Sequence, residues 1–302
     1  MSSTLLTPFT AGDGENLALY EWPLDAWSSH SGDPSLPPRG VVLIVHGLGE
    51  HAMRYDHVAN RLLAWGFVVR AYDQRGHGES SGARGALPSD TALLDDLAEV
   101  IDHTHSRYGM LPHCGSAGQP LPLILLGHSM GGLVVSRFVS LGIRPVEGLV
   151  LSSPALQTSL SRLQKLMLGA LPAVAPNLCV GNGLNARFIS RDERVVASYL
   201  ADPLVHDRIS PRLAAFIATA GPATLATAAQ WRTPTLLMYA GADRLVQPSG
   251  SRAFAEGATG STAVKPGTVT EKCFPDLYHE IFNELDSEPV FDTLQRWLDV
   301  RF

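Results

Sequence analysis

Short apolar runs recur along the chain at intervals that suit buried strands. Most are apolar at successive positions rather than at every second one, which is typical of strands covered on both faces of a sheet. They are VVLIV (41–45), FVVRAY (67–72), PLILLG (122–127), EGLVLSS (147–153), PTLLMYAG (234–241) and VTEKCF (269–274). The pattern predicts a mostly parallel sheet, to which LALYEW (17–22) adds antiparallel strands at one edge.

Amphipathic helical patterns separate these runs. In residues 90–107, apolar side chains recur at spacings of three and four from Leu93 to Thr104, with acidic residues on the opposite face. Residues 131–141 and 288–300 also read as helices. Alternating strand and helix signals favour an α/β fold in which helices flank the sheet.

One long segment breaks this alternation. Residues 155–231 contain no convincing strand and read as helices and loops. We therefore expect a helical cap inserted between two strands of the sheet, and a main domain made of residues 1–154 and 232–302. A second, shorter insertion at 110–120 is rich in Gly and Pro and predicts a surface loop.

Composition and charge narrow the classes of partner. The 302 residues are 45% hydrophobic with a net charge of −6 and no run of Lys or Arg, so nucleic acid is a poor partner. No apolar run is long enough to cross a bilayer, and the N-terminus lacks the pattern of a secretory signal. Cys114, Cys179 and Cys273 are odd in number and far apart, which predicts neither a disulfide framework nor a cysteine zinc site. We expect a reduced, cytoplasmic compartment.

The segment LILLGHSMGG carries a candidate nucleophile. Gly127-His128-Ser129-Met130-Gly131 is a G-x-S-x-G motif between a predicted strand and a predicted helix. Such a turn needs a positive φ at the serine and glycines beside it, because the strand and the helix meet closely. It would expose the Ser129 hydroxyl and aim the Met130 N–H at a reacting carbonyl. An ordinary βα turn is the alternative, whereas a phosphate-binding loop lacks its lysine.

A serine nucleophile requires a base and an acid, which follow it in the order acid, histidine on this kind of fold. Asp243 directly follows the strand at 234–241 and could orient an imidazole; its alternative role is that of a turn aspartate. Only His206 and His279 come after Ser129, and His206 lies in the insertion. We therefore predict His279 as the base, although a surface histidine in a loop is the alternative. Neighbouring Asp276 and Glu280 are left out of the triad.

The stretch VVLIVHGLGEH (41–51) allows two interpretations. His46, Glu50 and His51 suggest a metal site, with His77 and Glu79 as conceivable further ligands, but two glycines make this segment a loop rather than an HExxH helix. The other interpretation is an oxyanion loop, in which the Leu48 N–H joins the Met130 N–H to stabilise a tetrahedral intermediate. We favour the second interpretation, in which His46 is structural while Glu50 and His51 hold the loop.

These motifs together resemble those of a known family. VHGLGEH, YDQRGHGESSG, GHSMGG, SRDERVVASYLADPL, AGADRLV and YHEIFNE occur in the order found in the monoacylglycerol lipase/lysophospholipase group of the α/β-hydrolase superfamily. The resemblance implies an α/β-hydrolase fold with a cap at about 155–230. It implies that Ser129 is the nucleophile, Asp243 the acid and His279 the base, with the N–H groups of Leu48 and Met130 in the oxyanion hole.

The resemblance also implies two-step acyl transfer on a small lipophilic ester, with no metal and no organic cofactor. A monoacylglycerol, a lysophospholipid and a simple carboxylic ester all fit. An amidase, aminopeptidase or C–C hydrolase on the same triad and a non-catalytic ligand-binding protein remain alternatives. Dehalogenase and epoxide hydrolase chemistry would need a carboxylate in place of Ser129.

An apolar part of the predicted cap, residues 160–171, suggests a contact with the substrate or with lipid. Its side chains could line an acyl tunnel or touch a lipid aggregate or membrane, or they could simply pack the cap onto the main domain. The sequence leaves the acyl length and the oligomeric state open.

Overall fold

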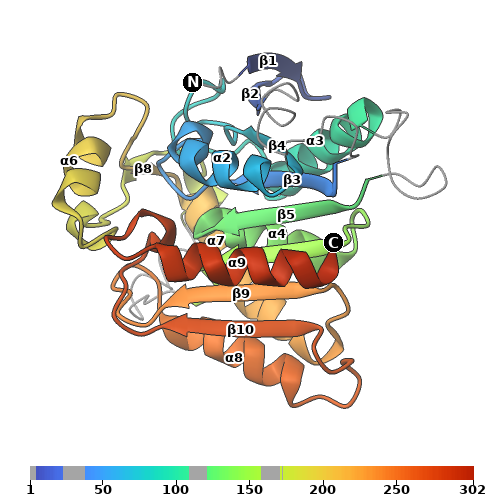
Figure 1. The fold of residues 1–302 in the computed structure, drawn as a ribbon. Coiled ribbons are helices and arrows are strands. Elements are labelled where there is room, and N and C mark those ends of the chain that lie inside the picture. Colours follow the sequence, from blue (N-terminus) through green and yellow to red (C-terminus); the bar gives the residue numbers. More distant parts are fainter. Residues whose placement is uncertain (1–4, 23–37, 109–120, 158–170, 172) are drawn as a thin grey trace.

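A mostly parallel sheet runs through the centre of the protein (Figure 1). The computed structural model describes residues 5–22, 38–108, 121–157, 171 and 173–302. Within them, one sheet has the order β1-β2-β4-β3-β5-β6-β9-β10, with β1, β2 and their junction to β4 antiparallel and the other pairs parallel. The strands are β1 (Leu5–Thr10), β2 (Asn16–Glu21), β3 (Gly40–Val45), β4 (Phe67–Tyr72), β5 (Leu123–His128), β6 (Gly148–Ser152), β9 (Thr235–Ala240) and β10 (Val269–Phe274).

All six predicted parallel strands are confirmed, and so is the antiparallel edge. Every residue of β3 is buried, and successive side chains enter different layers of the core. Leu43 packs in one hydrophobic cluster while Val42 and Ile44 pack in the other. The unbroken apolar run thus arises because both faces of the strand are covered.

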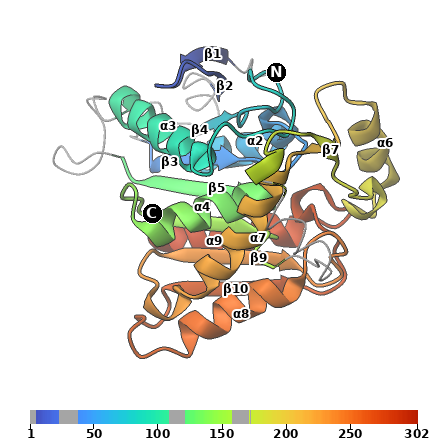
Figure 2. The same ribbon diagram turned by 180° about the vertical axis from the view of Figure 1, so that it is seen from behind.

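Helices cover both faces of the sheet, as predicted for this fold class (Figures 1 and 2). One face carries α2 (Asp56–Ala64) and α9 (Glu288–Arg301), whose apolar side chains lie in the cluster with Val42. The other face carries α3 (Ala92–Tyr108), α4 (Met130–Leu141), α7 (Pro211–Leu225) and α8 (Pro248–Thr259). The helices predicted at 90–107, 131–141 and 288–300 are confirmed, whereas the sequence analysis did not identify α2 or α8.

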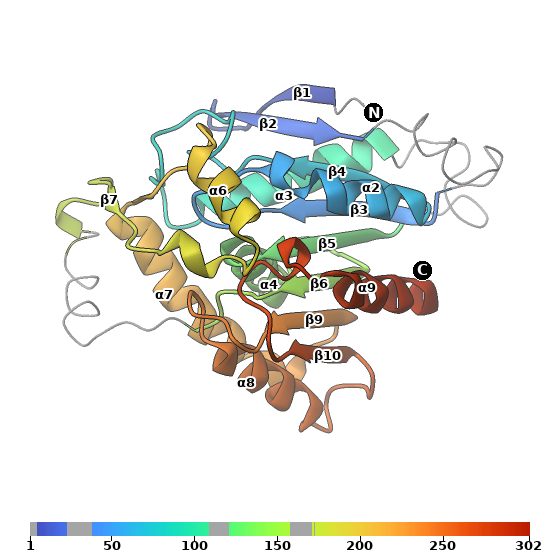
Figure 3. The same ribbon diagram turned by 60° about the vertical axis from the view of Figure 1, so that its left-hand side comes forward.

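The segment that follows β6 lies beyond the carboxyl ends of the strands (Figure 3). It contains α6 (Glu193–Ala201) and two short strands, β7 (Val180–Gly181) and β8 (Arg208–Ile209), which pair antiparallel. The expectation of no strand in this segment was therefore wrong, since two-residue strands are too short to produce a periodic pattern. The predicted loop at 110–120 and most of the apolar stretch at 160–171 lie outside the described residues.

The end of the insertion returns to the main domain. Helix α7 packs against α4 and α8, and its Leu213, Phe216 and Ala220 are buried in the core. Ser210 caps this helix by accepting a hydrogen bond from the Leu213 N–H, and Pro211 occupies the first turn. In the described part of the chain, no helix is both long and apolar enough to cross a membrane.

Candidate active site

Ser129 occupies a strained turn between β5 and α4. Its φ is 53°, in the left-handed region that a serine adopts only when the surroundings impose it. The surroundings are tight, because a Cβ at Gly131 would meet the carbonyl oxygens of Val45 and His46, and one at Gly127 would meet Val135. The glycines of G-x-S-x-G are thus required for the close approach of helix and strand, as the sequence predicted.

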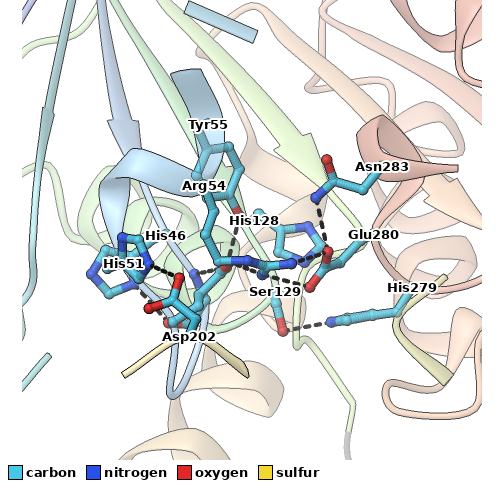
Figure 4. A network of polar contacts seen from close by, with 12 residues as sticks. His46, His51, Arg54, Tyr55, His128, Ser129, Asp202, His279, Glu280 and Asn283 are labelled. Carbon is cyan, nitrogen blue, oxygen red and sulfur yellow. Dashed lines mark hydrogen bonds and ion pairs between the residues drawn. The ribbon is translucent and has the colours of Figure 1, made fainter. Parts of the chain in front are cut away.

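The three predicted triad residues meet at the carboxyl edge of the sheet. Nδ1 of His279 lies 2.6 Å from Oδ2 of Asp243. Its Nε2 lies 2.8 Å from Oγ of Ser129, a contact drawn in Figure 4. An ionised carboxylate can only accept, so Nδ1 carries the proton, and Nε2 of the neutral ring can accept from the Ser129 hydroxyl. This is the geometry in which an imidazole can deprotonate a serine.

The Asp243 carboxylate is held in its ionised form. Its other oxygen accepts the N–H groups of Leu245, at 2.8 Å, and Val246, at 3.0 Å. Burial raises the pKa of Asp243, but the nearby His279 and these N–H groups outweigh burial, and the pKa is lowered. Burial likewise lowers the pKa of His279, but the charge and hydrogen bond of Asp243, with the nearby Glu280 and Glu50, together outweigh burial and raise the pKa above 6.5. Asp243 thus stabilises the imidazolium that proton transfer would produce.

The loop of residues 47–51, here called the oxyanion loop after its predicted role, follows β3 at the same carboxyl edge of the sheet. Gly47 approaches the turn so closely that a Cβ there would lie 3.2 Å from the Ser129 Cβ and 2.7 Å from Oε1 of Glu50. Neither the Leu48 N–H nor the Met130 N–H has a hydrogen-bond acceptor among the described residues. Two unused donors beside a hydroxyl are what an oxyanion hole requires.

Arg54 connects the oxyanion loop to the loop that carries His279. Its guanidinium bonds Oε2 of Glu50 at 2.5 Å and both carboxylate oxygens of Glu280 at 2.7 Å (Figure 4). Glu50 in turn accepts the Gly47 N–H at 2.6 Å and the Tyr55 hydroxyl at 2.7 Å. Glu50 therefore holds the loop, as predicted. Arg54 was missed, and its one sequence signal is the i,i+4 spacing from Glu50.

The Glu50 carboxylate keeps its charge near neutral pH. Burial raises the pKa of Glu50, but the Arg54 charge, together with the neighbouring histidines and the Tyr55 hydroxyl, outweighs burial, and the pKa falls to about 2. Arg54 is only 10% exposed in its side chain, so water screens its two ion pairs weakly. Glu50 and Arg54 therefore keep their charges in the pH range in which His279 titrates.

His128 is a second histidine at the site that the sequence analysis did not single out. Its ring centroid lies 4.7 Å from that of His279, and its Nδ1 lies 3.0 Å from Oγ of Ser152. Burial and the neighbouring His279 lower the pKa of His128 to about 4. It is therefore neutral wherever His279 titrates, and adds no charge that would oppose protonation of His279.

The histidines considered for a metal site have other partners. His46 accepts the Gln74 N–H at 2.9 Å through Nε2, so its Nδ1–H faces the Gly47 carbonyl oxygen. The His77 ring lies tilted against that of His206, with centroids 4.6 Å apart; its Nδ1 contacts the Arg75 carbonyl oxygen, while its buried Nε2 has no hydrogen-bond partner among the described residues. Both nitrogens of His206 are used, since Nδ1 accepts the Arg208 N–H and Nε2 contacts the Gly76 carbonyl oxygen. Among the described residues, no group of three or more His, Cys, Asp or Glu is arranged to hold a metal ion.

A cavity of about 430 Å³ opens above Ser129 and His279. The main domain and the inserted segment both line it. Its apolar lining residues include Leu184, Ile189, Leu200, Val205 and Leu245, and its polar lining residues include Glu50, His128, Tyr199, Asp202 and His206. A cavity with both apolar and polar lining suits an amphiphilic molecule whose reacting group lies at Ser129.

Comparison with known proteins agrees with this architecture. The sheet, its helices and the strand–turn–helix at Ser129 define the class of α/β-hydrolases. A family model described as serine aminopeptidase, S33 matches residues 36–286, and the chain belongs to this family. It is a serine hydrolase of the monoacylglycerol lipase-like group, which confirms the resemblance stated from the motifs.

Individual relatives match over nearly the whole chain. A monoacylglycerol lipase from Mycolicibacterium smegmatis is 35% identical over 301 residues, covering 99% of this chain and 98% of the relative. The crystal structure of Paleococcus ferrophilus monoacylglycerol lipase is 32% identical, with a TM-score of 0.76, over 88% of this chain and 96% of that one. A soluble variant of monoglyceride lipase from Saccharomyces cerevisiae shares the fold, with a TM-score of 0.82 at 22% identity, over 100% and 96%. These likenesses make the protein a hydrolase of the lipase and esterase type.

Proposed function

We propose that the protein hydrolyses monoacylglycerol-like and other lipophilic monoesters through an acyl-enzyme on Ser129. The observation that carries the proposal is the position of His279, which contacts both Asp243 and Ser129 at the floor of a partly apolar cavity. The relatives named as monoacylglycerol lipases support the substrate class.

The proposed first step is attack by the Ser129 hydroxyl on the ester carbonyl carbon. His279 takes the proton at Nε2, and Asp243 stabilises the resulting imidazolium. The negative carbonyl oxygen would be stabilised by the N–H groups of Leu48 and Met130, each donor being worth about 3 kcal/mol in comparable sites. His279 then protonates the leaving alcohol, which frees the acyl-enzyme.

In the proposed second step, water takes the place of the Ser129 hydroxyl as the nucleophile. Water donates a proton to His279 as it attacks the acyl carbon, and the same N–H groups stabilise the second tetrahedral intermediate. Collapse of that intermediate returns the proton to Ser129 and releases the acid. This chemistry proceeds with the residues present and uses no metal or organic cofactor.

We further propose that residues 155–231 act as a cap and that the cap contacts lipid aggregates or a membrane transiently. Among the described residues, most of the large hydrophobic side chains that are strongly exposed belong to this segment: Val174, Leu178, Val180, Leu184 and Leu200. An apolar group of this kind on one part of a surface is typical of an interaction site. A cytoplasmic location stays a prediction from the sequence.

A panel of esters and amides tests the proposed function. Glyceryl and p-nitrophenyl esters of increasing acyl length are compared with lysophospholipids and with matched amides. We expect turnover of glyceryl monoesters to exceed that of lysophospholipids and amides. Negligible ester turnover at every length would refute the proposal, and faster amide turnover would favour the aminopeptidase alternative.

The nucleophile is tested with a fluorophosphonate probe, which reacts with an activated serine. Wild-type protein should be labelled and Ser129→Ala should not, with ester turnover lowered by at least about 10⁴-fold. Ser152→Ala is a matched control, because this neighbouring serine contacts His128 rather than His279. Equal labelling of wild type and Ser129→Ala would exclude Ser129 as the nucleophile.

A further inference from the structure

The oxyanion loop is connected directly to the cap. The His206 N–H donates to the Gly49 carbonyl oxygen at 2.9 Å. Nε2 of His51 lies 2.8 Å from Oδ2 of Asp202 at the end of α6 (Figure 4). Because the carboxylate can only accept, the His51 Nε2–H is the donor. Gly49 and His51, in the loop that carries Leu48, are therefore hydrogen-bonded to residues more than 150 positions later in the chain.

The oxyanion loop and the cap are tightly packed against each other at Gly49. Gly49 has a φ of 77°, and a Cβ there would meet the carbonyl oxygen of His206. The Gly49 carbonyl belongs to the peptide unit that joins Gly49 to Glu50, two units after the one that carries the Leu48 N–H, so the cap contact fixes the backbone shortly after Leu48. On the other side of Leu48, the Gly47 N–H is held by Glu50 within the main domain.

The Asp202 carboxylate is held in place by a second hydrogen bond. Its Oδ1 accepts the Leu204 N–H at 2.9 Å, which fixes the carboxylate at the end of α6. One turn earlier, the ring of Tyr199 packs under the Arg54 guanidinium at 4.7 Å. The His51 side chain is only 6% exposed, whereas that of Asp202 is 26% exposed, so the bond between them is shielded from water mainly on the His51 side. This partly shielded contact connects the cap to the oxyanion loop.

We propose that Asp202 is a positioning residue that acts through His51 to hold the Leu48 N–H where the oxyanion forms. Stabilisation of the transition state then depends on a docked cap, and not only on residues of the main domain. The inference rests on the proposed function, because it assumes that Leu48 contributes to an oxyanion hole.

The test compares Asp202→Ala with Asp202→Asn on a short-chain, water-soluble ester. Asp202→Ala should lower kcat by about tenfold to a hundredfold with KM within about twofold, since an oxyanion donor acts mainly in the transition state. A trifluoromethyl ketone inhibitor, whose adduct with Ser129 carries an oxyanion, should bind more weakly by the same factor. Asp202→Asn should retain most of the activity, because its side-chain oxygen still accepts from His51.

A double-mutant cycle shows whether Asp202 acts through His51. The losses in kcat of His51→Ala and His51→Ala/Asp202→Ala should be about equal, since the second change removes a contact already lost. Glu193→Ala is the matched control: it removes a carboxylate from the same helix, and that carboxylate is exposed and contacts no residue of the oxyanion loop. This control should keep the wild-type kcat.

Several outcomes would overturn the inference while leaving the proposed function intact. These are an unchanged kcat in Asp202→Ala, a raised KM with unchanged kcat, and additive losses in the double mutant, each measured on protein whose melting temperature shows that it is folded. If Asp202→Ala does not fold, the His51→Ala variant and its inhibitor affinity decide the question. Wild-type protein without ester turnover would instead refute the proposed function.

Discussion

At the scale of single residues, each member of the candidate site has a strained or buried environment that suits one role. Ser129 has a backbone conformation that folding must impose, and His279 has a proton position set by Asp243. His128, only one residue from Ser129, is kept neutral by burial and by the nearby His279. His128 and Ser129 are adjacent in the chain, but they suit different roles because the surroundings of their side chains differ.

The pH dependence of ester turnover follows from the raised pKa of His279. The base must be neutral to accept a proton, so kcat/KM should fall as the pH drops through a value above 6.5. Asp243→Asn removes the charge that raises this pKa. The acid limb should therefore move to lower pH, while kcat falls by about 10⁴-fold because the imidazole loses its orienting partner.

A pH–rate profile of wild type and Asp243→Asn checks this expectation. Asp276→Asn serves as a control, because this exposed aspartate is close to His279 in sequence but is not its hydrogen-bond partner. An acid limb that stays in place in Asp243→Asn would contradict the assignment of Asp243 as the orienting acid.

At the scale of elements, one buried cation joins two loops from opposite ends of the chain. Arg54, just before α2, holds Glu50 of the oxyanion loop and Glu280 of the loop between β10 and α9. Glu280 is a neighbour of His279 and also donates its N–H to the Ile189 carbonyl oxygen of the cap segment. The oxyanion loop, the base and the cap thus meet in one network.

Removal of Arg54 should destabilise the fold strongly. Arg54→Met leaves two buried carboxylates without their cation, and we expect a loss of about 3–5 kcal/mol in the free energy of unfolding. Arg61→Met is the matched control, because Arg61 forms an exposed ion pair with Glu288 and its loss should cost at most about 1 kcal/mol. Chemical denaturation of the three proteins measures the difference. Equal losses in both variants would show that Arg54 contributes no more than a surface pair.

At the scale of the whole molecule, the proposed cap lies beyond the carboxyl ends of the strands (Figure 3). Several of its apolar side chains are exposed to solvent. Val174 is 84% exposed and Leu178 is 60% exposed. Such side chains favour contact with a lipid surface by the hydrophobic effect, at about 25 cal/mol for each Å² buried.

Binding to lipid should therefore depend on these residues. The Val174→Ser/Leu178→Ser variant should bind neutral phosphatidylcholine vesicles more weakly than wild type in co-sedimentation, with turnover of a soluble short-chain ester unchanged. Val300→Ser is the control, since Val300 is equally exposed but lies near the end of α9, far from the cap (Figure 1). Equal vesicle binding by all three proteins would exclude this surface as the lipid contact.

The sequence by itself determined the strands of the central sheet, three of the helices that flank it (α3, α4 and α9) and the order of the motifs. These features are local: β3 is apolar at successive positions because both of its faces are covered, and a Cβ at Gly127 would meet Val135 of the helix that directly follows the turn. The choice of Ser129, Asp243 and His279 also came from local signals, namely the residue that follows each strand. The structure brings these three together.

Only the tertiary structure decided which distant residues hold these groups in place. Arg54 meets Glu280 across 226 positions, and His51 meets Asp202 across 151. No periodicity or turn signal encodes such pairs, because their contact depends on how the cap and the loops fold back onto the sheet edge. The residues that do the proposed chemistry could be predicted from the chain, whereas the residues that position them could be seen only in the fold.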